Sequence, residues 1–135
     1  MTYLLDSNVC INYLRRRQSV IKQRINALPT NTIVLCAPVL TELVRGIRRS
    51  HNPTQEQARV TTLVRQFQVL PFDVVAAEEA GRVQSTLDAI GLPIGIADAY
   101  IAAIAIVNNL TLVTHNVREF GRVTGLVYED WQAIP

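Results

Sequence analysis

The chain has 135 residues, of which 49% are hydrophobic and 18% charged, and its formal net charge is +2. This length predicts a single domain over residues 1–135, and the composition excludes an intrinsically disordered chain. The longest apolar run, Ala99–Val107, is shorter than the roughly 20 residues that cross a membrane. No signal peptide precedes Asp6, and Cys10 and Cys36 are too few for a disulfide framework. We therefore expect a cytoplasmic protein with no membrane partner.

In the first half, short apolar stretches alternate with helical patterns. We expect a strand at 3–5, a helix from 7 to about 16 capped by Ser7 or Asn8, a helix at 20–28, a strand at 32–36, a helix after Pro38 and a helix at 53–66. The helix after Pro38 has an apolar face that packs in the core or lines a groove. Its members are Leu40, Leu43, Val44 and Ile47.

The second half continues the alternation. We expect a strand at 68–72, a helix at 74–90, a nearly all-apolar helix at 96–107, a strand at 110–114 and an edge strand at 126–128. Strands that are apolar on both sides and alternate with helices are typical of a parallel sheet covered on both faces. The sequence therefore predicts an α/β fold, a three-layer α/β/α sandwich with a central parallel sheet of four to five strands.

Acidic side chains from separate segments should meet at one edge of this sheet. Asp6 follows the first strand, Glu42 lies one turn into the helix after the second, and Asp98 opens the apolar helix. Ligands of parallel sheets bind beyond the carboxyl ends of the strands. Two carboxylates about 5 Å apart repel by roughly 3 kcal/mol at an effective dielectric of 20. A divalent cation, Mg²⁺ or Mn²⁺, relieves that repulsion.

Each acid also has an ordinary structural explanation. Asp6 is suited to cap a helix, Asp98 to face the positive end of a helix dipole, and Glu42 to lie exposed on a helix. A phosphatase with an aspartyl nucleophile would also carry an acid after its first strand. It would have a second Asp where this chain has Asn8.

Four segments resemble the motifs of PIN-domain ribonucleases. They are LLDSNV (4–9), PVLTEL (38–43), LPIGIAD (92–98) and LVTHNVREF (112–120), and residues 125–131 resemble the usual ending. The resemblance covers essentially the whole chain and is closest to the VapC toxins of bacterial toxin–antitoxin pairs. It implies a PIN-like fold and a metal-dependent endoribonuclease.

The resemblance also implies which residues form the site. The catalytic residues would be Asp6, Glu42, Asp98, Asn116 and Glu119. Asp6 and Asp98 would hold the Mg²⁺ or Mn²⁺. Many PIN domains have Asp where this chain has Asn116, so Glu119 shares that corner of the site. Ser7, Asn8 and Thr114 would support these residues.

The charges are unevenly distributed along the chain. Residues 1–65 carry ten Arg and Lys against three acids (net +7), whereas residues 66–135 carry three Arg against eight acids (net −5). This pattern indicates either a solvated basic surface or binding of an anionic polymer. The candidate RNA-binding residues are Arg15, Arg16, Arg17, Arg45, Arg48 and Arg49.

The resemblance further implies partners. Similar toxins cut tRNA in the anticodon loop, so the expected substrate is tRNA. A cognate VapB-type antitoxin would cover the acidic site, and the toxin would form homodimers that join the antitoxin in hetero-oligomers. DNA would be contacted only through the antitoxin. A catalytically silent PIN module that binds RNA or protein is the alternative, and Asn116 favours it.

Overall fold

The computed structural model describes residues 1–132, so the last three residues of the predicted domain lie outside the described part. Its centre is a five-stranded sheet in which all neighbouring strands are parallel, in the order β3-β2-β1-β4-β5. The strands are β1 (Tyr3–Leu5), β2 (Ile33–Cys36), β3 (Gln68–Leu70), β4 (Thr111–Val113) and β5 (Val127–Glu129). The predicted parallel sheet is confirmed, and β1 lies at its middle.

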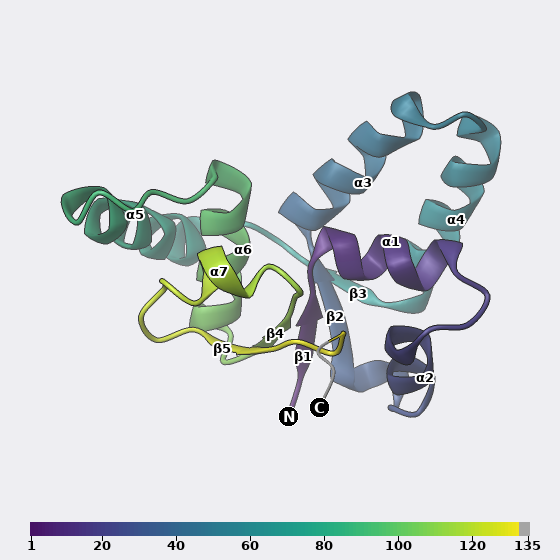
Figure 1. Cartoon of the computed structure of the whole chain (residues 1–135), viewed down its shortest axis with the longest axis horizontal. Helices are drawn as coiled ribbons and strands as arrows, with labels where there is room; N and C mark the ends of the chain where they lie inside the picture. Colours follow the sequence, from purple (N-terminus) through teal and green to yellow (C-terminus); the bar gives the residue numbers. More distant parts are fainter. Residues whose placement is uncertain (133–135) are drawn as a thin grey trace.

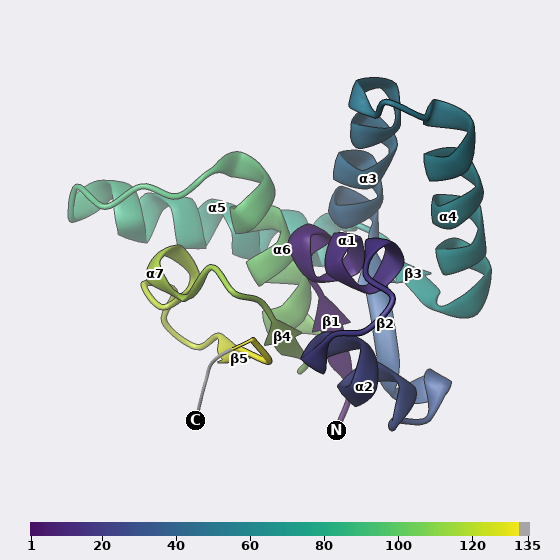
Figure 2. The ribbon, with the colours of Figure 1, turned by 45° about the vertical axis from the view of Figure 1, so that its right-hand side comes forward.

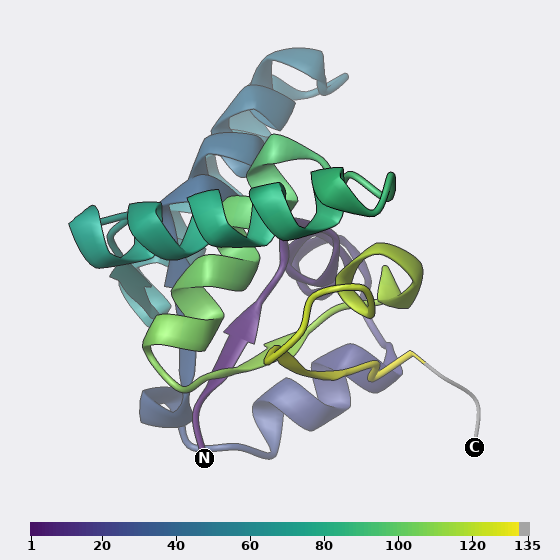
Figure 3. The same ribbon diagram turned by 90° about the vertical axis from the view of Figure 1, so that its left-hand side faces the viewer.

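Helices cover both faces of this sheet. They are α1 (Ser7–Arg15), α2 (Val20–Asn26), α3 (Ala37–Arg49), α4 (Pro53–Gln66), α5 (Val74–Ala89), α6 (Ile96–Val107) and α7 (Val117–Phe120). Figure 3 shows α5 and α6 in front of the sheet and α1 and α2 behind it. Figures 1 and 2 show α3 and α4 as a hairpin that projects beyond the sheet. The α/β/α class is confirmed.

The core lies on both sides of the central strands. All four residues of β2 and all three of β4 are buried, as expected for strands covered by helices on both faces. The predicted buried helix is confirmed as α6, whose alanines Ala99, Ala102 and Ala105 are fully buried. Both cysteines are buried free thiols.

Several local expectations are corrected. Asp6, not Ser7 or Asn8, caps α1, because its carboxylate accepts the N–H of Val9. The short helix α7 and a 3-10 turn at Thr30–Thr32 were not predicted, since neither is long enough to show periodicity. Within the described residues, no helix is long and apolar enough to span a membrane.

The apolar face predicted for α3 is only partly buried. Leu43 and Ile47 are buried in the core and Leu40 packs against it, whereas Val44 is 49% exposed. This helix belongs to the projecting hairpin (Figure 1), so part of its face lies beyond the edge of the sheet.

Candidate active site

Asp6 lies at the carboxyl end of the central strand and is 5% exposed. One carboxylate oxygen accepts the N–H of Val9 at 2.9 Å, and the other accepts the hydroxyl of Thr114. Burial raises the pKa of Asp6 and outweighs these two hydrogen bonds, and the charges of Glu42 and Asp130 raise it further. Asp6 therefore caps a helix and also lies among other acids.

Thr114 joins β1 to the segment that follows β4. Its fully buried hydroxyl donates to Asp6 and accepts the backbone N–H of Asn116 at 3.0 Å. The backbone N–H of Asp6 also donates to the carbonyl of Val113 at 3.1 Å. These bonds hold the fourth sequence motif against the first, which supports the predicted supporting role of Thr114.

Glu42 lies in the second turn of α3 and is partly buried. The hydroxyl of Ser7, the first residue of α1, donates to its Oε1 atom at 2.9 Å. This bond brings the start of α1 and the middle of α3 together. Asn8, the other residue predicted to support the site, is exposed, and it forms no hydrogen bond to these acids within residues 1–132.

Asp98 lies in the first turn of α6. Burial, together with a hydrogen bond to Glu119, raises its pKa to about 7. The negative charges of Glu119, Glu42 and Asp6 contribute to this same increase. Asp98 therefore feels the charges of acids that come from the end of β1, from α3 and from α7.

Glu119, rather than Asn116, supplies the charge at the fourth corner. It shares a hydrogen bond with Asp98, and the side-chain amide of Asn116 donates to its Oε2 atom at 3.4 Å. Asn116 directly precedes the short helix α7, and Glu119 lies in the first turn of that helix. The structure thus brings together Asp6, Glu42, Asp98 and Glu119, with Asn116 beside them.

Asp130 is a fifth acid that sequence analysis missed. It follows β5 directly, and its charge contributes to the raised pKa of Asp6. His115, which is exposed, lies 3.0 Å from its carboxylate through Nδ1. The same rule that drew attention to Asp6, an acid at the carboxyl end of a parallel strand, also applies to Asp130.

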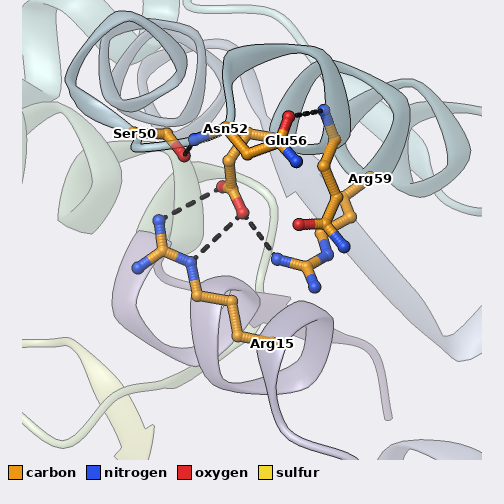
Figure 4. A network of polar contacts seen from close by, with 6 residues as sticks. Arg15, Ser50, Asn52, Glu56 and Arg59 are labelled. Atoms are coloured by element: carbon orange, nitrogen blue, oxygen red, sulfur yellow. Dashed lines mark hydrogen bonds and ion pairs between the residues drawn. The ribbon is translucent and has the colours of Figure 1, made fainter.

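The predicted RNA-binding arginines differ in their surroundings. Arg15 is held by Glu56 of α4 through two hydrogen bonds of 3.3 and 3.2 Å, and Arg59 donates to the same carboxylate at 2.8 Å (Figure 4). Arg15 therefore has a structural partner. The other five are exposed, as Arg15 also is: Arg16, Arg17, Arg45, Arg48 and Arg49.

The chemistry of the cluster suits a hard divalent cation. Its donors are carboxylate, hydroxyl and amide oxygens, which Mg²⁺ and Mn²⁺ prefer. Within residues 1–132, no three His, Cys, Asp or Glu side chains stand close enough to enclose a metal ion. Mg²⁺ needs no such cage, since one or two carboxylates commonly hold it with several waters. The residues therefore fit a largely hydrated ion.

Comparison with known proteins places the chain among related sequences. The PIN domain family model matches residues 3–126. The tRNA(fMet)-specific endonuclease VapC of Shigella flexneri is 34% identical, with 97% of this chain and 98% of the relative covered. Ribonuclease VapC2 of Rickettsia felis is 32% identical over the same shares.

Solved structures give the same picture. VapBC2 from Rickettsia felis, bound to a DNA fragment from its promoter, matches with a TM-score of 0.90 and 31% identity, covering 97% of this chain and 99% of that one. DNA-bound VapBC from Salmonella typhimurium matches with a TM-score of 0.90 and 33% identity, covering 97% and 98%.

Proposed function

This chain belongs to the PIN-domain family and, within it, to the VapC ribonuclease toxins of VapBC toxin–antitoxin systems, and from that premise we propose that it is a metal-dependent endoribonuclease that cuts tRNA in the anticodon loop. The observation that carries the proposal is that Glu119 shares a hydrogen bond with Asp98 and that the charges of Glu42 and Asp6 also act on it. The negative charges of these carboxylates repel one another, and a divalent cation offsets that repulsion.

Asp6 and Asp98 hold the cation in this proposal. Both oxygens of Asp6 already accept hydrogen bonds, yet each carboxylate oxygen retains a further lone pair for a ligand. A Mg²⁺ or Mn²⁺ ion held there would supply the positive charge that lowers the pKa of a bound water and offsets the charge of the phosphodiester in the transition state.

The remaining residues have two roles: some hold the carboxylates in position, and one accepts a proton. Ser7 holds the carboxylate of Glu42 through its hydroxyl, and Asn116 holds that of Glu119 through its amide. We assign to Glu119 the proton that the attacking water loses, because it lies beside Asp98 and is less constrained than Asp6. The oxygen of water bonds to phosphorus, the bond from phosphorus to the 3′ oxygen breaks, and the 3′ oxygen takes up a proton from solvent, which leaves a 3′-hydroxyl and a 5′-phosphate.

A single-stranded loop of tRNA is the substrate that we favour. The Shigella relative is named for the cleavage of tRNA(fMet). Loops expose splayed bases that proteins can bind, whereas the narrow major groove of double-stranded RNA hides them. The exposed arginines of the first half, such as Arg48 and Arg49, would bind the phosphate backbone.

We also propose a VapB-type antitoxin as the partner. Three of the related solved structures are VapBC assemblies, and two of these three are bound to DNA. By analogy, a toxin homodimer would join the antitoxin in a hetero-oligomer, and the antitoxin would contact DNA. A tail with an Arg side chain would be attracted to the acidic cluster and cover it. Because tRNA is cytoplasmic, so is the proposed site of action.

RNA cleavage by the purified protein tests the proposal. We expect cuts in the anticodon loop of a tRNA with Mg²⁺, none with a chelator, and loss of at least about 100-fold in rate for Asp98→Asn, because a ligand and its charge are removed. The matched control is Asp88→Asn, which replaces an exposed acid on α5 and should cut at the normal rate.

Two outcomes would contradict the proposal. Full activity in Asp98→Asn, or cleavage that persists in chelator, would exclude the assigned site. Binding of tRNA without any cleavage would instead favour a silent RNA-binding module. In bacterial cells, expression of the chain should arrest growth, expression of Asp98→Asn should not, and a co-expressed cognate antitoxin should relieve the arrest.

A further inference from the structure

A cavity of about 410 Å³ opens directly beside the acidic cluster. It lies between α3, the start of α6 and the segment that joins β3 to α5, and Glu42 is part of its wall. Its volume falls within the range of about 300–1,000 Å³ that is usual for sites of small ligands. The cavity therefore shares a wall with the site at which the phosphodiester would be cut.

The cavity is lined mainly by apolar and aromatic side chains. Phe72 and Tyr100 stack on each other, with ring centroids 4.3 Å apart and an interplanar angle of 30°. Pro38 and Ile96 are also in the wall, and Ile96 is 62% exposed. A planar aromatic group that enters the cavity can continue this stack.

Two charged residues of α3 also line this cavity. Glu42 and Arg45 follow each other by three residues on α3, so both lie on one face of that helix. Glu42 belongs to the acidic cluster, whereas the guanidinium of Arg45 is exposed. A ligand with a flat apolar ring and an attached anionic group would match this cavity. The ring would contact the aromatic wall, and the anionic group would contact the guanidinium of Arg45.

We propose that this cavity binds one nucleobase of the RNA, that of a nucleotide next to the bond being cut, with Arg45 contacting its phosphate. The inference deepens the proposed ribonuclease function and rests on it. A base has apolar faces that stack on aromatic side chains, and its phosphate lies one sugar away. A base in the cavity would therefore have its phosphate close by. Because Glu42 belongs both to the cavity wall and to the acidic cluster, the base site and the cleavage site would be adjacent.

Fluorescence of 2-aminopurine tests base stacking without any cleavage. The probe is an anticodon stem-loop RNA with 2-aminopurine at each loop position in turn, bound to the inert Asp98→Asn protein. We expect quenching beyond that of the free RNA at one position next to the cut. When Phe72→Leu is added to the Asp98→Asn protein, this quenching should be lost. When Phe72→Tyr is added instead, the aromatic ring is kept and the quenching should remain.

Kinetics with an abasic substrate provide a second test. Removal of the pocketed base should raise KM of the otherwise unaltered protein by about tenfold, the scale of one base–aromatic stack. Phe72→Leu should raise KM for the intact RNA by a similar factor, and the abasic change should then add little. The control Tyr128→Ala removes an aromatic ring on β5, outside the cavity, and should stay as sensitive to base removal as the unaltered protein.

The possible results separate this inference from the function on which it rests. If the protein cuts RNA but no loop position shows the Phe72-dependent quenching, the base pocket is wrong and the ribonuclease stands. If no RNA is cut or bound, both are wrong. If Phe72→Leu cuts RNA normally but resists inhibition by an antitoxin, the cavity takes a protein side chain and the inference is wrong. Circular dichroism of each variant establishes that it is folded.

Discussion

The carboxyl group of Asp98 has its pKa raised from 3.8 to about 7, first by burial and then by its hydrogen bond to Glu119. The folded chain therefore holds this proton more tightly than the unfolded chain does. Between about pH 4 and pH 7, folding takes up a proton, so stability falls as the pH rises through this range and levels off above it. The charge on Asp98 therefore lowers the free energy of unfolding at neutral pH.

Asp98→Asn should relieve this cost at the expense of activity. We expect the variant to unfold at a higher temperature than the unaltered protein at pH 8, because the amide carries no charge near Glu119, Glu42 and Asp6. The increase should be smaller at pH 5, where Asp98 is protonated in the folded state. Thermal unfolding without divalent ions measures both. Equal increases at the two pH values would contradict this account of Asp98.

At the scale of elements, one carboxylate ties the projecting hairpin to the rest of the fold. Glu56 is in the first turn of α4 and 7% exposed, and it accepts hydrogen bonds from Arg15 at the end of α1 and from Arg59 (Figure 4). The hydrogen bond from Arg15 is the main reason that the pKa of Glu56 is lowered. Because Asp6 caps the start of α1, this network links the hairpin to the helix that starts at the candidate site.

Glu56→Gln should weaken that link. We expect a decrease of about 1–2 kcal/mol in the free energy of unfolding at pH 7, below the usual range for charged hydrogen bonds because Arg15 is half exposed. The lowered pKa means that the stabilisation is present above pH 4.5 and is lost as the pH falls, so the difference should shrink in acid. Urea unfolding measures it.

A matched control lies on α5. Glu79 pairs with Arg82 three residues on, at 2.7 Å, but Arg82 is largely exposed and the pair lies within one helix. Glu79→Gln should therefore cost no more than about 0.5 kcal/mol. A similar decrease in both variants would mean that the Glu56 network does not hold the hairpin.

At the scale of the whole molecule, the basic and the acidic halves of the chain lie in different parts of the fold. The basic first half includes the hairpin of α3 and α4 that projects beyond the sheet (Figure 1). The acidic second half supplies Asp98, Glu119 and Asp130. The exposed arginines at the end of α3 therefore lie on an element that extends away from the sheet. A long anion such as RNA can contact this hairpin while one of its phosphates is at the acidic edge.

Replacement of Arg48 and Arg49 by Gln should weaken RNA binding without changing the position of the cut. We expect the dependence of log K on log salt to become shallower by about 0.7 for each phosphate that the protein no longer neutralises. Titration of a labelled tRNA at several salt concentrations measures this slope. Arg82→Gln, in the acidic half, should leave the slope unchanged. An unchanged slope in the Arg48/Arg49 variant would make these arginines a solvated surface only.

Much of the fold and the main acids of the candidate site could be predicted because their causes are local. An apolar strand that ends in Asp6, and an apolar helix that begins near Asp98, are visible in a few consecutive residues. The repeated alternation of such strands with helices then implies a parallel sheet with its acids at one edge. The sequence left the cap of α1 open among Asp6, Ser7 and Asn8, since all three are good capping residues, and the structure assigns it to Asp6.

Only the tertiary structure decided which distant side chains meet. The bond of Thr114 to Asp6 spans 108 positions, and that of Arg15 to Glu56 spans 41. Such pairs depend on strand order and on how the helices pack, neither of which leaves a periodic trace in the chain. Local chemistry therefore determined the elements and their acids, whereas packing determined that Glu119 bonds to Asp98 and that Phe72 faces Tyr100.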